Sequence, residues 1–221
     1  MASKNPSSTP TASHEKQRST GINGRGISTR AKIIDEARRQ ITTNGLKATT
    51  AATVAAGVNI PRPLFYHYFR NLDELAEEIL DEIVNSFIDQ LKQWYAQSSH
   101  ETLDESLDHI IALWRTAHDD SGAFSDQLAR SGNAAMYASF IVHIGDKFAR
   151  FLTDNVIPKF ASRVEEPITY VYETLFSLVI GINELMRIRP DFSNDEIKHM
   201  VVQALRFEPL VTSEHSSGEN A

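Results

Sequence analysis

Apolar side chains recur at intervals of three and four residues over most of this chain, which is the spacing of one face of an α-helix. The first clear example is residues 30–44, where Ile33, Ala37 and Ile41 fall on one face and Gly45 follows as a stop residue. No stretch shows the strict alternation of apolar and polar residues that is typical of a half-buried strand. The pattern therefore predicts an all-α protein.

Two short helices with a tight connection follow this first helix. Residues 51–57 carry small packing residues after Thr49 or Thr50 as the cap, and the next helix opens at Pro61. Asn59, in the connection, is able to adopt the left-handed backbone conformation that a sharp corner between helices requires. Two short helices joined in this way are typical of a helix-turn-helix motif.

From residue 73 the pattern changes to long amphipathic helices. The first of them starts with acidic side chains, which suit the positive end of a helix dipole. The last two are apolar on more than one face, so they need burial on several sides. The predicted helices cover residues 73–97, 102–118, 124–130, 134–155, 168–188 and 194–207, with a loop at 119–122 and a minor turn at 159–164.

Composition divides the chain into four predicted segments. Residues 1–27 are rich in Ser, Thr, Pro, Asn and Gly with scattered basic residues, and they predict a disordered basic arm that is either a solvated tail or a contact to DNA. Residues 28–72 form a predicted helix-turn-helix domain and residues 73–207 a larger helical domain. Residues 208–221 predict a disordered tail.

Charge is distributed unequally between these segments. Residues 1–72 carry 11 Lys and Arg against 3 Asp and Glu, a formal charge of +8. Residues 73–221 carry 11 Lys and Arg against 26 Asp and Glu, a formal charge of −15, so that the whole chain has −7. A basic end on an acidic body is the distribution expected when only that end meets phosphate, and the acidic body favours one docking orientation.

The remaining composition excludes several classes of protein. The chain has no cysteine, which excludes disulfides, thiolate metal sites and a cysteine nucleophile. No apolar run approaches the roughly 20 residues that span a bilayer, and no apolar segment near the start resembles a secretory signal. We therefore expect a cytoplasmic protein that does not bind a membrane.

A set of residues with specific spacing lies between Thr29 and Leu75. Its members are Arg30, Ile33-Ile34, Ala37, Gly45, Thr49-Thr50, Val54-Ala55, the turn Val58-Asn59-Ile60-Pro61 and Tyr66-His67-Tyr68-Phe69. With these residues the segment resembles the TetR family of repressors, and from Thr49 to Phe69 it matches the family pattern without a gap. The chain departs from the family pattern at Pro61, which replaces the usual capping serine, and at Leu72, which stands where the family often has a lysine that contacts phosphate.

The resemblance implies an architecture and a mode of action. It implies a helix-turn-helix DNA-binding domain followed by a helical-bundle domain that binds a ligand and dimerises through residues 168–188 and 194–207. A homodimer would bind a palindromic DNA operator, and a small-molecule effector would release it, with repression as the family default. The sequence leaves open the effector, the operator and whether the protein represses or activates.

The predicted DNA-binding residues gather around the second short helix of the motif. Arg62, at its exposed first turn, is able to bind guanine through two acceptors or to contact phosphate only. Pro63 and Leu64 are placed to pack on a thymine methyl, and the resemblance implies a phosphate contact for Tyr66; Phe65 and Phe69 are expected in the core. The full predicted set is Arg30, Lys47, Thr50, Pro61, Arg62, Pro63, Leu64, Tyr66, His67, Tyr68 and Arg70.

Aromatic and polar side chains in the larger domain suggest a pocket for the effector. An apolar cavity with a few convergent polar groups is typical of a small-molecule site. The alternative is that these aromatic residues, which lie at helical spacing, are ordinary core. The predicted ligand-binding residues are Trp114, His118, Met136, Tyr137, Phe140, His143, Tyr172, Phe176 and Asn183.

Two other classes of function compete with the regulator. A di-metal enzyme in a helix bundle needs glutamates on two helices and Glu-x-x-His on two more, whereas this chain offers one such motif, Glu196 to His199, and the pair Glu105 and His109. A helical interaction module without DNA binding leaves the charge distribution and the spacing of Tyr66 to Phe69 unexplained. We therefore expect no enzymatic activity, no metal and no cofactor.

Overall fold

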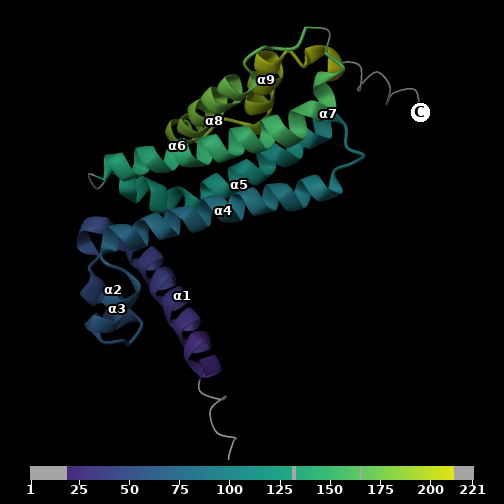
Figure 1. Cartoon of the computed structure of the whole chain (residues 1–221). Coiled ribbons are helices and arrows are strands. Elements are labelled where there is room, and N and C mark those ends of the chain that lie inside the picture. Colours follow the sequence, from purple (N-terminus) through teal and green to yellow (C-terminus); the bar gives the residue numbers. More distant parts are fainter. Residues whose placement is uncertain (1–18, 131–132, 165, 212–221) are drawn as a thin grey trace, which may run out of the picture.

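The computed structural model describes residues 19–130, 133–164 and 166–211, and within these ranges it contains helices and no strand (Figure 1). This confirms the predicted all-α class. The elements are α1 (Ser19–Asn44), the 3-10 turn η1 (Leu46–Ala48), α2 (Ala51–Gly57), α3 (Arg62–Tyr68), α4 (Leu72–Gln97), α5 (Leu103–Arg130), α6 (Ala134–Phe151), the π-helical turn η2 (Leu152–Val156), α7 (Ile157–Ala161), α8 (Val171–Ile188) and α9 (Asn194–Leu205).

The helices form two regions that share the long helix α4. Figure 1 shows α1, α2 and α3 together at one end of the molecule, where α4 begins, and α5 to α9 stacked along the rest of α4. Helix α1 packs against α4 and α5, and α6 lies against α8. None of the helices in the described ranges is long and apolar enough to cross a membrane.

Local residues define the boundaries of the short helices. Gly45, with φ 81°, ends α1 in the left-handed region that favours glycine. Thr50 caps α2 in a capping box with Thr53. Asn59 has φ 55°, which confirms the left-handed corner predicted between α2 and α3. Asn71 caps α4 by accepting a hydrogen bond from the Glu74 N–H.

Helix α1 starts earlier than the sequence pattern indicates. The predicted arm covers residues 1–27 and the predicted helix starts near residue 30, whereas α1 begins at Ser19. No proline stands between Pro10 and Pro61, so every backbone N–H of this stretch is able to join the helix, even though its glycines have a low helix propensity. The rest of the predicted arm lies outside the described residues.

Helix α5 is continuous where the sequence predicted a loop at residues 119–122. The Ser121 hydroxyl donates to the Ala117 carbonyl at 2.7 Å, so it bonds within the helix and does not cap a new one. Phe124 and Leu128 are buried and continue the apolar face, and this packing outweighs the low helix propensity of Gly122. The predicted short helix at 124–130 is therefore the last part of α5.

The helix predicted to stop before Pro158 continues through a wider turn. Helix α6 passes into η2 and then into α7, which has Pro158 in its first turn. Proline lacks an N–H and clashes with the preceding turn of an α-helix, and a π-helical turn is one way to accommodate it without ending the helix. Leu152 and Val156 of η2 line an apolar cavity of the larger domain.

The C-terminal end of the described chain is more ordered than predicted. Residues 208–211 of the predicted tail form a helical turn, because the apolar side chain of Leu210 is buried and its N–H donates to the Phe207 carbonyl at 3.0 Å. Residues 212–221 of that tail lie outside the described residues. Helix α8 begins at Val171, not near residue 168, and α9 ends at Leu205.

Candidate nucleic-acid interface and sensor cavity

The helix-turn-helix rests on a small aromatic and aliphatic core. Phe65 is 0% exposed and Phe69 is 2% exposed, which confirms their predicted place in the core. Their rings lie 6.0 Å apart, and Val54 of α2 and Ile33 of α1 are also fully buried. Because this core holds the inward side of α3, the other side of α3 is left for solvent or DNA.

The outward side of α3 carries most of the residues predicted to read DNA. Arg62, Pro63, Tyr66 and His67 are exposed, as is Pro61 immediately before the helix. Leu64 and Tyr68 are half-buried. The structure thus brings the α3 part of the predicted set onto one surface, with its first turn most accessible.

The side chains of Arg62 and Tyr66 contact each other on this surface. The Arg62 guanidinium donates to the Tyr66 hydroxyl at 3.0 Å, and its central carbon lies 5.4 Å from the centroid of the Tyr66 ring. Residues four apart are neighbours on a helix surface, so the spacing alone could have indicated the pair. The phenol holds the guanidinium over the first turn of α3, the part that enters a major groove in helix-turn-helix proteins.

Apart from Pro61, the N-cap of α3, four predicted contacts lie outside α3, and they are in different situations. Lys47 is exposed on η1, while the Thr50 hydroxyl is occupied as the cap of α2. Arg70 has 86% of its side chain exposed but pairs with Glu74 at 3.2 Å. The Arg70 N–H and then its guanidinium hold the pKa of Glu74 below its ordinary value. Arg30 is not on the α3 surface, and its partners lie on α4 and in the core.

Two ion pairs join the DNA-binding region to α4. Arg30 pairs with Glu78 at 2.9 Å and lies 5.0 Å from the centroid of the Phe69 ring. Arg38 pairs with Glu82 at 3.0 Å. Exposed pairs of this kind contribute little to stability singly, about 0–1 kcal/mol, but here they fix how α1 lies along α4. Sequence reasoning missed them because the partners are far apart in the chain.

A second cluster that sequence reasoning missed joins α1 to α2. Glu36 accepts from Gln40 Nε2 at 2.6 Å, and the same Gln40 nitrogen donates to the Thr53 carbonyl at 3.0 Å. Arg39 donates twice to Glu36, at 2.9 and 2.6 Å. At Gly57 a Cβ would lie 2.2 Å from a Glu36 oxygen, so glycine makes room for this carboxylate. The sequence signal for this cluster was Gln40, a polar residue that the structure shows to be buried.

This cluster predicts a pH dependence for Glu36→Gln. Hydrogen bonds from Arg39 and then Gln40 lower the pKa of Glu36 from 4.5 to about 2. Its contribution to stability is therefore complete above pH 4.5 and is lost as the pH falls toward 2. We expect the variant to be less stable by about 1–2 kcal/mol at neutral pH. In denaturant titrations the difference from wild type should close below pH 4.5, and a difference independent of pH would contradict this role.

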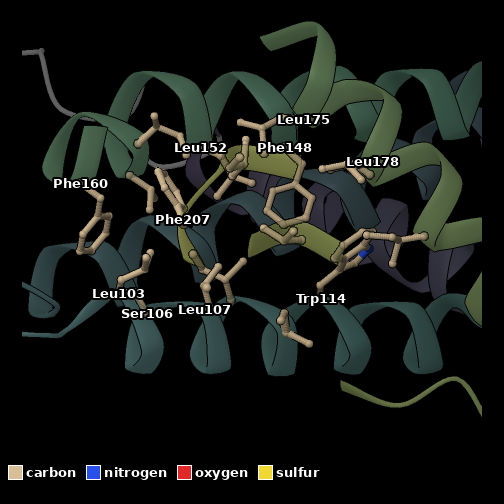
Figure 2. Close-up of a pocket in the computed structure, with 18 residues that line it drawn as sticks. Leu103, Ser106, Leu107, Trp114, Phe148, Leu152, Phe160, Leu175, Leu178 and Phe207 are labelled. Atoms are coloured by element: carbon tan, nitrogen blue, oxygen red, sulfur yellow. The ribbon is translucent and has the colours of Figure 1, made fainter. Parts of the chain in front are cut away.

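The larger domain contains a largely enclosed apolar cavity (Figure 2). Its volume is about 40 Å³ and its exposed wall is carbon only. Figure 2 shows Leu107 and Trp114 on one side, with Phe148, Leu152 and Leu175 facing them. The wall combines residues of α5, α6, η2, α7, α8 and α9 with Phe207.

The predicted ligand residues do not converge on this cavity. Of the nine, Trp114 alone lines it. His118 lies 3.3 Å from Asn183, and Phe176 stacks on Tyr172 with ring centroids 6.0 Å apart.

The others lie where α6 meets α8 or α4. Tyr137 donates to Glu184 at 2.6 Å, and Tyr172 donates to Asp146. These two bonds link α6 to α8. The predicted residues Met136, Phe140 and His143 line an open groove that α4 and α6 share.

The candidate metal motif is engaged in helix capping. The Glu196 carboxylate accepts from the Ser193 N–H at 2.8 Å and from the Ser193 hydroxyl at 3.0 Å, which completes the capping box of α9. Glu105 caps α5 in the same way through Thr102. In the part of the chain that the structure describes, no three His, Asp or Glu side chains gather as metal ligands.

Comparison with known proteins agrees with this arrangement. Residues 33–79 match the family model of bacterial regulatory proteins of the tetR family. No curated protein sequence matches the chain. The match to the family model covers α2 and α3 in full, together with parts of α1 and α4.

Solved structures share the fold at low sequence identity. A protein from Mesorhizobium loti assigned to the TetR-family transcriptional regulators has a TM-score of 0.62 at 12% identity, covering 81% of this chain and 94% of its own. A TetR-family regulator from Streptomyces coelicolor has 0.59 at 17%, covering 88% and 85%. One from Syntrophomonas wolfei, similarly assigned, has 0.59 at 16%, covering 80% and 92%. Residues 33–79 therefore match the tetR family of bacterial regulatory proteins, and the chain shares the fold of solved structures assigned to the TetR-family transcriptional regulators.

Proposed function

We propose that this protein is a DNA-binding transcriptional regulator of the TetR family, a repressor that binds a palindromic operator as a homodimer and is released by a small-molecule effector. The observation that carries the proposal is the outward surface of α3, where Arg62 is exposed and held by Tyr66. An arginine oriented in this way is suited to the two acceptors of guanine in the major groove. A regulator that acts on the chromosome would work in the cytoplasm.

The outer surface of α8 and α9 supports the proposed dimer. A groove there is lined by Thr174, Ser177 and Gly181 of α8 together with Met200 and Ala204 of α9. A Cβ at Gly181 would meet nothing within 4 Å, so the helix surface is open to a close neighbour. Small residues let two helices approach closely, and a two-fold dimer matches a two-fold operator.

Gly181→Arg should convert the dimer to monomers. The long charged side chain would enter the surface where the partner's helices pack and would be desolvated there without a partner. Gly122→Arg is the matched control, because a Cβ at Gly122 of α5 also meets nothing within 4 Å and Gly122 does not line the groove between α8 and α9. Sedimentation equilibrium should give a monomer for the first variant and a dimer for wild type and control. A dimer in all three would contradict this interface.

Release requires the effector to favour one arrangement of α4. Helix α4 connects the two regions through Glu78 and Glu82, so a shift of α4 would change the spacing of the two α3 helices in the dimer. The effector must prefer the released arrangement by its coupling free energy, typically about 1–3 kcal/mol. A molecule that bound both arrangements equally would not regulate.

Selection from a library of genomic fragments tests the proposal. Bound fragments should share an inverted repeat and should carry one dimer per repeat. The genes beside those fragments should be more strongly expressed when this protein is deleted. Fragments without inverted repeats, or genes that lose expression on deletion, would contradict the operator or the repressor assignment respectively.

A further inference from the structure

The cavity of the larger domain offers no hydrogen-bonding partner to a guest molecule. Ser106 lines it, but its hydroxyl donates to Glu101 at 3.3 Å, and no oxygen or nitrogen atom contributes to the exposed wall. A charged or strongly polar group placed there would lose its water without any compensating hydrogen bond. The cavity is therefore suited to hydrocarbon.

The cavity also has a wall that is able to yield. At about 40 Å³ it holds only a small part of an organic molecule, so a guest must push its walls apart. Leu178 and Val201 are half-buried and form part of the wall, and η2 contributes Leu152 and Val156 beside the bend at Pro158. π-Helical turns occur frequently at functional sites. Apolar cavities of this kind stay dry, so hydrocarbon enters without displacing bound water.

One buried ring joins the cavity to α4. No residue of α4 lines the cavity, so an occupant acts on α4 only through its neighbours. Phe148 is a wall residue whose ring lies 5.2 Å from Trp114 and 4.9 Å from Phe87 of α4, in edge-to-face contacts. Phe148 and Phe87 are each 1% exposed, so neither ring moves without the other repacking.

We propose that this cavity binds the effector, that the effector is a neutral molecule with an alkyl chain, and that Phe148 transmits its entry to α4. The inference rests on the proposed function and names the ligand class of that regulator. An occupant that widens the space between α5 and α8 displaces Phe148, and Phe148 displaces Phe87. Helix α4 then shifts relative to α5, and with it the ion pairs that hold α1.

A brominated alkanol locates the binding site directly. The chain has two tryptophans, and Trp94→Phe leaves Trp114 of the cavity wall as the single reporter. Titration of the full-length variant with 10-bromodecanol should quench Trp114 fluorescence with saturation. The converse variant, Trp114→Phe, retains Trp94 and should show no saturable quenching. Equal quenching in both variants, or none in either, would overturn the site.

Substitutions at two adjacent residues distinguish binding in the cavity from binding at the surface. Val201 lines the cavity, whereas Val202 beside it on α9 faces a different surface depression. Val201→Phe fills the cavity and should weaken binding of 10-bromodecanol by about tenfold or more, while Val202→Phe should leave it unchanged. Equal affinities in the two variants, each first shown to be folded by circular dichroism, would overturn the proposal.

Three ligands with alkyl chains of equal length and different head groups test whether the ligand is neutral. Decanol should bind at least as tightly as decanoate and decyltrimethylammonium, because a charged head finds no partner in the wall. Tighter binding of either charged probe by more than about tenfold would overturn the assignment of a neutral ligand.

Release from DNA is measured with the operator fragment obtained from the genomic selection. Saturating decanol should weaken operator binding by wild-type protein by about 5- to 150-fold. Phe87 contacts Phe148 but does not line the cavity, so Phe87→Leu should still be quenched by 10-bromodecanol but should lose this release. Protein that binds the operator but not decanol would refute the ligand class alone, whereas protein that binds no operator would refute the proposed function. Undiminished release in Phe87→Leu would refute the transmission from Phe148 to α4.

Discussion

Arg62→Ala should weaken operator binding about 5- to 150-fold per half-site, the effect of losing one bidentate contact of about 1–3 kcal/mol to guanine. In a homodimer the loss occurs twice, so the combined effect on one operator is larger still. Arg62 is exposed on the first turn of α3, and its removal leaves the core under α3 untouched. Fluorescence anisotropy with the selected operator and with random DNA, at matched salt, measures the effect.

Comparing the selected operator with random DNA decides whether Arg62 contacts bases or only phosphate. Loss on the operator should greatly exceed loss on random DNA, and Arg62→Lys should restore the charge without the two-pronged contact. Tyr66→Phe removes the hydroxyl that accepts from Arg62, so it should also weaken the operator more than random DNA, by less than Arg62→Ala does. Equal losses of Arg62→Ala on both kinds of DNA would show that this residue contacts phosphate only.

Phe65→Ala should remove the DNA-binding fold while the larger domain stays folded. The ring is 0% exposed and packs between Tyr66 and Phe69, with centroids 5.4 and 6.0 Å away. Replacing a buried phenylalanine with alanine costs about 3–5 kcal/mol, a large share of what a small helical unit has. We expect loss of operator binding and of hydrogen-exchange protection in α2 and α3.

His67→Ala is the control for this experiment. His67 lies on the same helix and is exposed, so the variant should keep the protection of α2 and α3. Helices α5 to α8 should keep their protection in both variants. Unchanged protection of α2 and α3 in Phe65→Ala would show that the small core does not depend on this ring.

The helix-turn-helix was predictable because its determinants are local. The left-handed corner at Asn59, the cap at Thr50 and the burial of Phe65 and Phe69 follow from residues within a short stretch of chain. The contact of Arg62 with Tyr66 also follows from helical spacing. The partner of Arg30 was not predictable, because Glu78 reaches it only after the chain has turned through α2 and α3.

The sensor cavity was harder to predict because it depends on how separate helices meet. Aromatic and polar residues drew attention in the sequence, yet the wall consists mainly of aliphatic side chains that look like ordinary core. Tyr137 and Tyr172 instead bond across α6 and α8, outside the cavity. Helix α5 supplies part of this wall, and its length was also predicted wrongly. The low helix propensity of Gly122 indicated a break, whereas tertiary packing keeps the helix continuous.

In the proposed complex the basic end containing α3 meets DNA phosphate while the acidic larger domain stays clear of it. Binding to duplex DNA as a function of salt concentration measures this directly. Purified protein should be retained on genomic duplex fragments, and the logarithm of its affinity should fall linearly and steeply with the logarithm of the salt concentration. If no fragment were retained in a salt-sensitive way, the account of this protein as a DNA-binding regulator would be contradicted.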